Sequence, residues 1–468
     1  MTSSTSHSVY SPYSQASVGQ VSFSSQEDIE SALTVAYALH RDRDGWLKKT
    51  ERIAILKRAA DLIAERRQAL ALQAASEGGK PLKDSLVEVD RGIEGILNCI
   101  EVFRTDAGHV IPMGLNATSL GKVAFTQYEP IGVVAAVSAF NHPFNLIIHQ
   151  VIPAIAVGCP VIVKPASKTP LSCKAIIEIL SESGLPDGWA QMVLPEQNEL
   201  TEKFVADSRI GFFSFIGSAA VGWMLRSKLA PGTRFALEHG GVAPVIFAAD
   251  ADIEDAAPRL ARGGFWHAGQ ACVSVQRVFC HSSIAQQLAK RLGALGDALA
   301  VGDPTDAKTD VGPLINEREA VRVGRWVDEA VSGGAELISG GHSLGNNCYS
   351  PTVLLNPPIN SNVMQKEVFG PVIAVYSFDD IDDAIGLANA LDYSFQAAVF
   401  TNSLDTAMHC YQRIDATAVM INENTLFRVD WMPFAGARHS GHGVGGIPHT
   451  MKEMQTEKMM VWRSKVLE

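Results

Sequence analysis

The chain has 468 residues, of which 47% are hydrophobic, and a formal net charge of −11. This length exceeds what one compact core holds, so we expect two or three globular domains. The negative charge argues against nucleic acid or an anionic membrane as a partner. The seven cysteines lack the spacing of metal ligands. We therefore expect no metal site, no disulfide framework and a cytoplasmic location.

The first 130 residues show three kinds of pattern. Residues 1–20 are rich in serine and carry no Lys, Arg, Asp or Glu. They lack a secretory signal, and we interpret them as a loose polar N-terminal arm along the surface. Residues 26–106 follow as helices, because apolar side chains recur there at helical spacing. Alternation within 121–127 then predicts a strand flanked by turns.

From residue 132 to residue 237, predicted strands and helices alternate. Continuous apolar strands in such units are typical of a parallel sheet covered by helices on both faces, which is a dinucleotide-binding class of fold. The turn 215–222 follows one strand and opens a helix, with Gly217 and Gly222 near its ends. It could hold a pyrophosphate, or it could be an ordinary turn, since the stretch lacks a GxGxxG pattern. The apolar region 131–163 is interrupted by polar residues and predicts no membrane helix.

A cysteine and a glutamate stand out in the second half of the chain. Cys272 ends the stretch 265–272 and follows a Gly-Gln pair, while Glu238 lies upstream, shortly before a Gly-Gly pair. A thiol that attacks carbon needs a base to accept protons and activate water. Either residue alone is common, but together they resemble the aldehyde dehydrogenase superfamily. In that family the cysteine is the nucleophile and the glutamate is the general base.

The resemblance extends from about residue 26 to the C-terminus. It implies an α/β fold with a Rossmann-type cofactor domain, a second α/β catalytic domain and a small β arm for oligomerisation, in a homodimer or homotetramer. The expected division is a polar N-terminal arm (1–20), an NAD(P)-binding domain (21–115 and 130–237), a catalytic domain (238–440) and an oligomerisation arm (116–129 and 445–468).

The resemblance also implies roles for individual residues. Asn141, which alone would be a turn or cap residue, is expected to donate an N–H to the oxyanion. Glu367 is expected to hold the nicotinamide ribose, and Phe369 to pack beside the ring. The expected cofactor-binding residues are Lys164, Ser167, Gly217, Ser218, Gly222, Glu367 and Phe369. The cofactor is NAD or NADP.

Ser167 is a departure that bears on the choice of cofactor. NAD-preferring relatives often have Glu here, which would repel a 2′-phosphate. Ser167 removes that repulsion, and Lys168 adds positive charge nearby. We therefore expect NADP to be accepted, alone or beside NAD.

The substrate prediction rests on Arg104 and His149. His149 lies eight residues after Asn141, about two helical turns on, so it could face the same funnel. Together with the segment 428–434, the pair resembles family members that act on phosphonoacetaldehyde, and Trp266 argues against succinic semialdehyde. We expect Arg104 and His149 to bind an anionic tail. The alternative is a solvated helix-end arginine and a core histidine.

The expected reaction converts a short aldehyde to its carboxylic acid through a thioester on Cys272, with a phosphonate, sulfonate, phosphate or carboxylate tail on the substrate. Broad activity on neutral aldehydes is one alternative. A CoA-acylating enzyme is another, although such relatives tend to lack the glutamate. A non-catalytic binding protein would use the same fold. A thiol hydrolase would pair Cys272 with His267, for which a turn or core role is the simpler interpretation.

Overall fold

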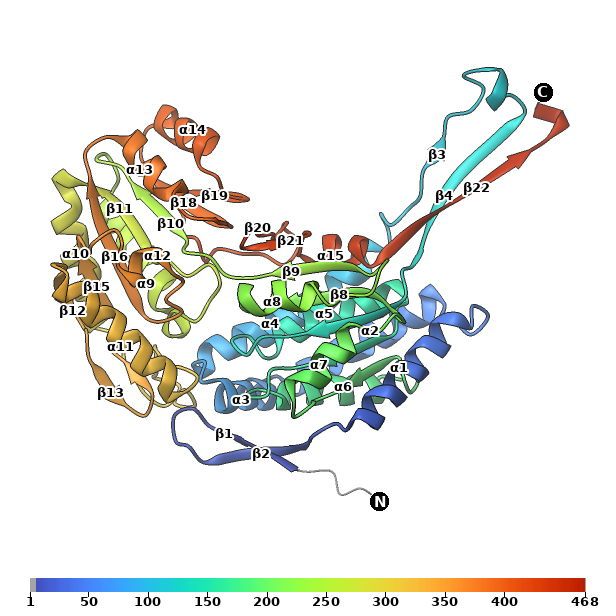
Figure 1. Ribbon diagram of the computed structural model, residues 1–468, viewed down its shortest axis with the longest axis horizontal. Helices are drawn as coiled ribbons and strands as arrows, with labels where there is room; N and C mark the ends of the chain where they lie inside the picture. Colours follow the sequence, from blue (N-terminus) through green and yellow to red (C-terminus); the bar gives the residue numbers. More distant parts are fainter. Residues whose placement is uncertain (1–5, 468) are drawn as a thin grey trace.

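The computed structural model describes residues 6–467, which are built around two large sheets (Figure 1). The first sheet has six strands, in the order β21 (Gly441–His442), β9 (Arg234–Glu238), β8 (Ile210–Ile216), β5 (Val133–Val137), β6 (Val161–Lys164) and β7 (Ala190–Met192). Helices enclose it: α1 (Gln26–Arg41), α2 (Lys49–Glu65), α3 (Arg67–Gly78), α4 (Leu82–Val102), α5 (Asn145–Val157), α6 (Leu171–Glu182), α7 (Asn198–Val205), α8 (Ala219–Arg226) and α15 (Ile447–Glu453).

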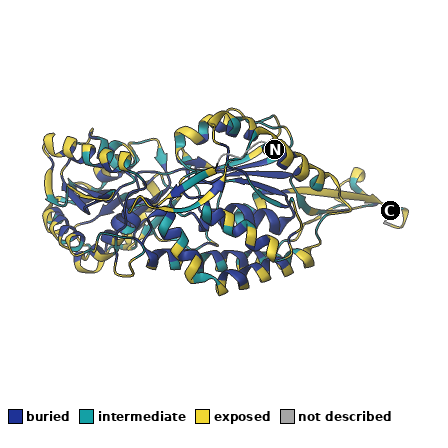
Figure 2. Ribbon diagram, turned by 90° about the horizontal axis from the view of Figure 1, so that it is seen from below, coloured by how far each residue is buried: buried dark blue, intermediate teal, exposed yellow. Residues whose placement is uncertain are grey.

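The strands of this first sheet are parallel except for β21, which pairs antiparallel with β9. All five residues of β5 are buried, because helices cover both faces of the sheet. Figure 2 shows this buried core between layers of helices. The sheet therefore has the continuous apolar strands that the sequence predicts.

The second sheet has seven strands. Their order is β12 (Glu336–Ser339), β15 (Thr352–Leu355), β16 (Val372–Phe378), β11 (Arg277–His281), β10 (Pro244–Phe247), β18 (Gln396–Phe400) and β19 (Ala418–Ile421). The helices of this half are α9 (Ile253–Phe265), α10 (Ser282–Asp297), α11 (Glu317–Ser332), α12 (Asn362–Gln365), α13 (Ile381–Asn389) and α14 (Leu404–Arg413). Two short strand pairs complete it: β13 (Ser343–Gly345) with β14 (Cys348–Tyr349), and β17 (Tyr393–Ser394) with β20 (Ala437–Arg438).

A three-stranded arm projects from the first half of the molecule (Figure 1). It consists of β3 (Val110–Ile111), β4 (Lys122–Pro130) and β22 (Gln455–Arg463), all antiparallel. Large apolar side chains on it are exposed, with Trp462 at 64%. An exposed apolar ribbon of this kind favours pairing with another chain. Its contact with a second subunit stays a prediction.

Several expected boundaries differ from the structure. Instead of a loose arm, β1 (Ser6–Tyr10) and β2 (Ser17–Ser22) form an antiparallel hairpin; residues 1–5 lie outside the described range. β3 belongs to the arm and not to the cofactor half, because it pairs with β4. α15 packs into the core beside α4 and α5, so the arm proper resumes only at β22.

Within residues 6–467, no helix combines the length and apolar character needed to cross a bilayer.

Candidate active site

A cavity of about 1060 Å³ lies between the two halves of the molecule. Its walls include the loops that follow β5, β6, β8 and β9, at the carboxyl edge where parallel sheets bind ligands. The opposite wall comes from segments around Cys272, Glu367 and Arg428. Of the predicted site residues, it brings together Asn141, Lys164, Ser167, Gly217, Ser218, Glu238, Cys272, Glu367 and Phe369.

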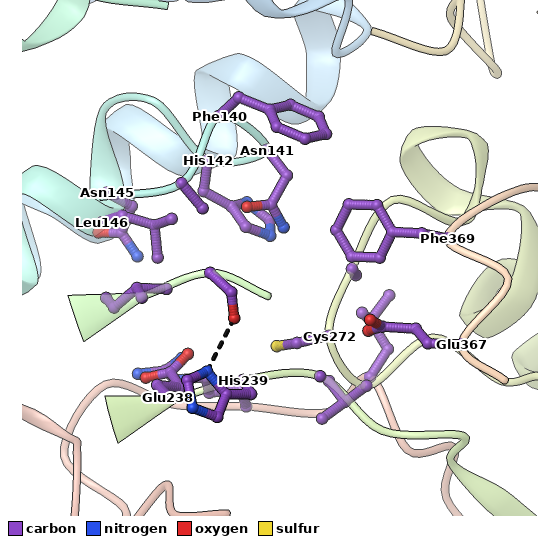
Figure 3. Close-up of a pocket in the computed structure, with 18 of the residues that line it drawn as sticks. Phe140, Asn141, His142, Asn145, Leu146, Glu238, His239, Cys272, Glu367 and Phe369 are labelled. Carbon is purple, nitrogen blue, oxygen red and sulfur yellow. Dashed lines mark hydrogen bonds between the residues drawn. The ribbon is translucent and has the colours of Figure 1, made fainter. Parts of the chain in front are cut away.

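Cys272 lies in the loop after α9, half-buried, with its sulfur pointing into the cavity (Figure 3). Burial and the nearby Glu238 carboxylate raise the pKa of the Cys272 thiol well above its usual range, and Arg428 opposes them. The thiol is therefore protonated at neutral pH in this state. Attack on a carbonyl requires a group that takes up its proton or stabilises the thiolate.

The turn before Cys272 has an unusual backbone. His267 and Ala268 have positive φ angles of 49° and 53°, which non-glycine residues rarely adopt. Gly269 follows with φ of 69°, and a Cβ there would stand 2.0 Å from the Gly370 carbonyl oxygen. Only glycine fits at this point. The tight turn, η2 (Trp266–Gly269), thus lies against the Gly370 backbone, just before β16, and leads directly into the cysteine loop.

Glu238 ends β9 and lies across the cavity from the Asn141 loop (Figure 3). Burial raises the pKa of the Glu238 carboxyl, and Arg428 partly opposes this. A carboxyl with a raised pKa is a stronger base than an exposed one. Its position suits activation of a water beside Cys272.

Asn141 is 5% exposed and is held by the backbone of the cysteine loop. Its Nδ2 donates to the Gln270 carbonyl at 2.9 Å. Gln270 is fixed in turn, because its Nε2 donates to the His267 carbonyl and its Oε1 accepts from the Ile315 N–H. An amide NH₂ has two donors, so one N–H of Asn141 stays available to the cavity.

The residues expected to hold the cofactor fit a dinucleotide. Glu367 is half-buried, its enclosed Oε1 has no hydrogen-bond partner, and burial raises the pKa of its carboxyl to about 8. An unpaired buried oxygen of this kind suits a ribose hydroxyl. Ser218 caps α8 without a side-chain hydrogen bond of its own, so its hydroxyl is free to meet a phosphate at the helix N-terminus. Phe369 meets Phe140 edge-to-face, with ring centroids 5.9 Å apart, to form an aromatic wall.

Comparisons with known proteins agree with this geometry. A model described as "Aldehyde dehydrogenase family" matches residues 1–460. The chain is 36% identical to the 3-sulfolactaldehyde dehydrogenase of Priestia megaterium, over 97% of this chain and 94% of that protein. Aldehyde dehydrogenase 21 from Physcomitrella patens, solved with the reaction product succinate, matches with a TM-score of 0.94, 32% identity and coverage of 99% and 96%. The glyceraldehyde-3-phosphate dehydrogenase of Methanocaldococcus jannaschii, complexed with NADP, matches with a TM-score of 0.93, 32% identity and coverage of 99% and 100%.

The chain belongs to the aldehyde dehydrogenase family. It has the α/β fold of that family and is an NAD(P)-dependent oxidoreductase that acts on aldehydes. The predictions of superfamily, fold class, enzyme class and NAD or NADP as cofactor are therefore confirmed.

One residue of this aldehyde dehydrogenase that was expected to contact the cofactor phosphates lies elsewhere. Gly222 does not line the cavity. A Cβ at Gly222 would stand 2.0 Å from His239 Cε1, so this glycine makes room for the imidazole. His239 is held there through Nδ1 by the Gly217 carbonyl at 2.9 Å, drawn dashed in Figure 3. Gly222 thus has a packing role, and Gly217 and Ser218 are the residues that face the cavity.

The predicted substrate pair Arg104 and His149 requires correction, because neither residue lines the cavity. Arg104 is exposed in the turn after α4. α5 begins only at Asn145, so His149 is not two helical turns beyond Asn141. Its imidazole is buried and its Nε2 donates to Asp430 Oδ1 at 2.8 Å. The alternative interpretation, an exposed helix-end arginine and a core histidine, describes both residues.

Of the cationic side chains that line the cavity, Arg428 acts on both Cys272 and Glu238, and Arg91 lies close to Arg428. Asp430 connects α4 and α5, because its carboxylate accepts hydrogen bonds from Arg91 Nη2 at 2.6 Å and from His149. Although burial acts in the other direction, His149 and Arg91 hold the pKa of Asp430 well below its usual range. Arg428 and Asp430 could have been found from the sequence, because they are the charged residues at the start of the segment 428–434. Arg91 lies in a long helix and carried no signal.

Proposed function

We propose that this aldehyde dehydrogenase oxidises a short aldehyde with an anionic tail to its carboxylic acid, through a thioester on Cys272. The tail is a phosphonate, sulfonate, phosphate or carboxylate. The observation that carries the proposal is the buried guanidinium of Arg428 in the cavity wall, close to Cys272 and Glu238.

Arg428 is poorly satisfied by the protein around it. Its side chain is 12% exposed, and its Nε is buried without a hydrogen-bond partner. The guanidinium lies over the Phe434 ring, with Cζ 3.6 Å from the centroid, and Nε is 3.9 Å from Asp430 Oδ1. A buried cation needs compensation. An anionic group on the substrate would supply it, because two of its oxygens can meet the fork of donors.

Asp430 does not cancel this positive charge. Both its oxygens are engaged by Arg91, through Nε at 3.1 Å and Nη2 at 2.6 Å, and one oxygen also accepts from His149. The Asp430 carboxylate thus serves two guanidinium groups, and Glu238 is the other carboxyl that acts on Arg428. Arg91 is 26% exposed and lines the same cavity, so it adds to the attraction for an anion.

Three related proteins support this direction, whereas others are named for lactaldehyde, which has no anionic tail. The names of the Priestia megaterium and Methanocaldococcus jannaschii enzymes imply a sulfonate and a phosphate on their substrates, and succinate is the product held by the moss enzyme. All three are small carbon chains with an anionic group.

In the proposed mechanism the Cys272 thiol gives up its proton to solvent as the sulfur attacks the carbonyl carbon, and the free N–H of Asn141 stabilises the oxyanion. One such donor is typically worth roughly 2.7–4 kcal/mol. The nicotinamide, when bound, supplies the acceptor for hydride. Glu238 then removes a proton from the water that attacks the thioester and releases the acid. Arg428 holds the tail through both steps and keeps the carbonyl beside the sulfur.

Replacing Arg428 with glutamine tests the tail-binding role. We expect kcat/KM for an anionic aldehyde to fall roughly 10–100-fold, because charge-assisted hydrogen bonds contribute roughly 1.5–3 kcal/mol. A neutral aldehyde of equal length should lose much less. The ratio of kcat/KM for the anionic aldehyde to kcat/KM for the neutral one separates binding of the tail from effects of Arg428 on Cys272 and Glu238, which are common to both substrates.

Arg104→Gln is the matched control, since Arg104 is exposed and outside the cavity. It should leave both substrates near wild-type rates. Equal losses for anionic and neutral aldehydes in Arg428→Gln would refute the tail contact. A wild type that prefers neutral aldehydes would favour the broad-specificity alternative.

We also propose that NADP is accepted at least as well as NAD. Ser167 lines the cavity, and its carbonyl is held by His7 Nε2 at 2.7 Å. A serine there offers no negative charge against a 2′-phosphate. Ser167→Glu is expected to shift the ratio of kcat/KM for NADP over NAD by about tenfold or more toward NAD, through like-charge repulsion. Ser167→Gln, of similar size but neutral, is the control. A wild type that ignores NADP would contradict the proposal.

A further inference from the structure

A buried polar cluster lies behind the Asn141 loop. Lys80 follows the end of α3 and is fully buried, and Glu88 on α4 is 3% exposed. The third member is His142, which is half-buried and lines the cavity beside Asn141. No step of the mechanism above uses Lys80 or Glu88. A buried ion pair this close to a reaction site needs a physical account.

The contacts of the cluster divide between backbone and side chain. Glu88 Oε1 accepts the N–H groups of Phe144 and Asn145, both at 2.9 Å, and so fixes the loop backbone. Its other oxygen accepts from Lys80 Nζ. Lys80 Nζ also contacts His142 Nδ1. The pair therefore connects one helix, the oxyanion loop and a cavity-lining imidazole.

Stacking on a neighbouring ring also fixes the plane of the imidazole. The Trp266 ring stacks on His142, with centroids 5.3 Å apart and planes inclined by 27°. Lys80 Nζ lies 5.1 Å from the centroid of the same indole. Ring position and ring orientation are thus both set by neighbours and not by solvent.

The hydrogen bond from Lys80 decides the protonation of the imidazole. Burial lowers the pKa of Lys80, but its pairing with the Glu88 carboxylate opposes this and favours the ammonium form, which has only donors, so His142 Nδ1 accepts. A neutral imidazole that accepts at Nδ1 carries its proton on Nε2. Burial and the Lys80 charge hold the pKa of His142 well below its usual range, and His267, Arg91 and Arg428 act in the same direction.

We propose that Lys80, supported by Glu88, is a positioning residue that fixes His142 as the neutral Nε2–H tautomer and so gives the cavity a second hydrogen-bond donor beside Asn141. That donor suits an oxygen of the aldehyde or its tail. Because the ring is neutral, its contribution does not change with pH across the range in which an ordinary histidine titrates. The substrate contact rests on the proposed function, whereas the tautomer does not.

The tautomer can be measured without substrate. Long-range proton–nitrogen NMR of the full chain labelled with nitrogen-15 histidine distinguishes the two neutral tautomers from imidazolium. The signal that disappears in His142→Gln belongs to His142. We expect the Nε2–H pattern, unchanged from about pH 6 to about pH 8. An Nδ1–H pattern, or an imidazolium in that range, would overturn the proposal whatever the substrate is.

Kinetics test whether Lys80 acts through His142. Lys80→Met is combined with Glu88→Gln, so that no charge is left unpaired and both backbone hydrogen bonds can remain. We expect kcat/KM for an anionic aldehyde to fall about tenfold at pH 8 and to gain a new ionisation, that of His142, below the pH at which an exposed histidine titrates, because burial, Arg91 and Arg428 still lower its pKa. In a His142→Gln background, which keeps a donor that cannot titrate, the same pair of changes should add no ionisation.

A new ionisation that appears without His142, or none when His142 is present, would contradict the assignment. If the paired variant does not fold, the NMR measurement on the wild type decides. A wild type that shows the Nε2–H tautomer but prefers neutral aldehydes would refute the anionic substrate while keeping the positioning role.

Discussion

Cys272→Ala is expected to abolish aldehyde oxidation, with less than about a thousandth of the rate remaining. Alanine has no nucleophilic atom, so neither the covalent adduct that carries the oxyanion nor the thioester can form. Reduced cofactor is measured with an aldehyde of the preferred class. Binding of NADP should persist, because the residues proposed to hold the dinucleotide lie on other segments of the cavity wall.

Cys410→Ala is the matched control. Cys410 is fully buried in α14, outside the cavity, and burial raises the pKa of its thiol to about 11. It should behave as an inert apolar side chain and keep activity. Retention of more than about a thousandth of the rate by Cys272→Ala would show that Cys272 is not the nucleophile.

Glu238→Gln is expected to stop turnover after acylation of Cys272, before the thioester is hydrolysed. The thioester should still form, giving a burst of reduced cofactor in stopped flow, while steady turnover collapses by about a hundredfold or more. Glutamine keeps the size of the side chain, so the cavity is preserved. Loss of the burst together with turnover would place Glu238 in an earlier step or in a structural role.

The same residue predicts the direction of the pH dependence. Burial raises the pKa of Glu238, and the base must be deprotonated to act. Turnover should therefore fall as pH drops through a value above that of an ordinary carboxyl, and be full above it. In Glu238→Gln this acid limb should disappear from the residual rate.

Much of the fold follows from local pattern. β5 and β6 are short and almost wholly apolar, and such strands are buried on both faces. Once the parallel sheet is predicted, Asn141 and Lys164 must meet at its carboxyl edge. The place of Cys272 came from the family resemblance. The N-terminal hairpin escaped prediction because its serine-rich strands lack an apolar alternation.

The substrate end of the cavity could not be predicted in the same way. Arg91 meets Asp430 across 339 positions of sequence, and no periodicity encodes a contact at that separation. His149 was misplaced because a helix was extended back to Asn141, whereas the loop runs to Phe144. Lys80 and His142 are likewise joined only by tertiary packing. Polar pairs that form only by tertiary packing leave no local pattern in the sequence from which they could be predicted.

The most direct test is mass spectrometry of Glu238→Gln after mixing with NADP and an anionic aldehyde. The account predicts a mass increase equal to the acyl group, confined to the peptide that contains Cys272 and removed by hydroxylamine. Its amount should match the burst of NADPH, and a neutral aldehyde of equal length should give it more slowly. NADPH formed with no adduct on Cys272, or an adduct on another residue, would contradict the account.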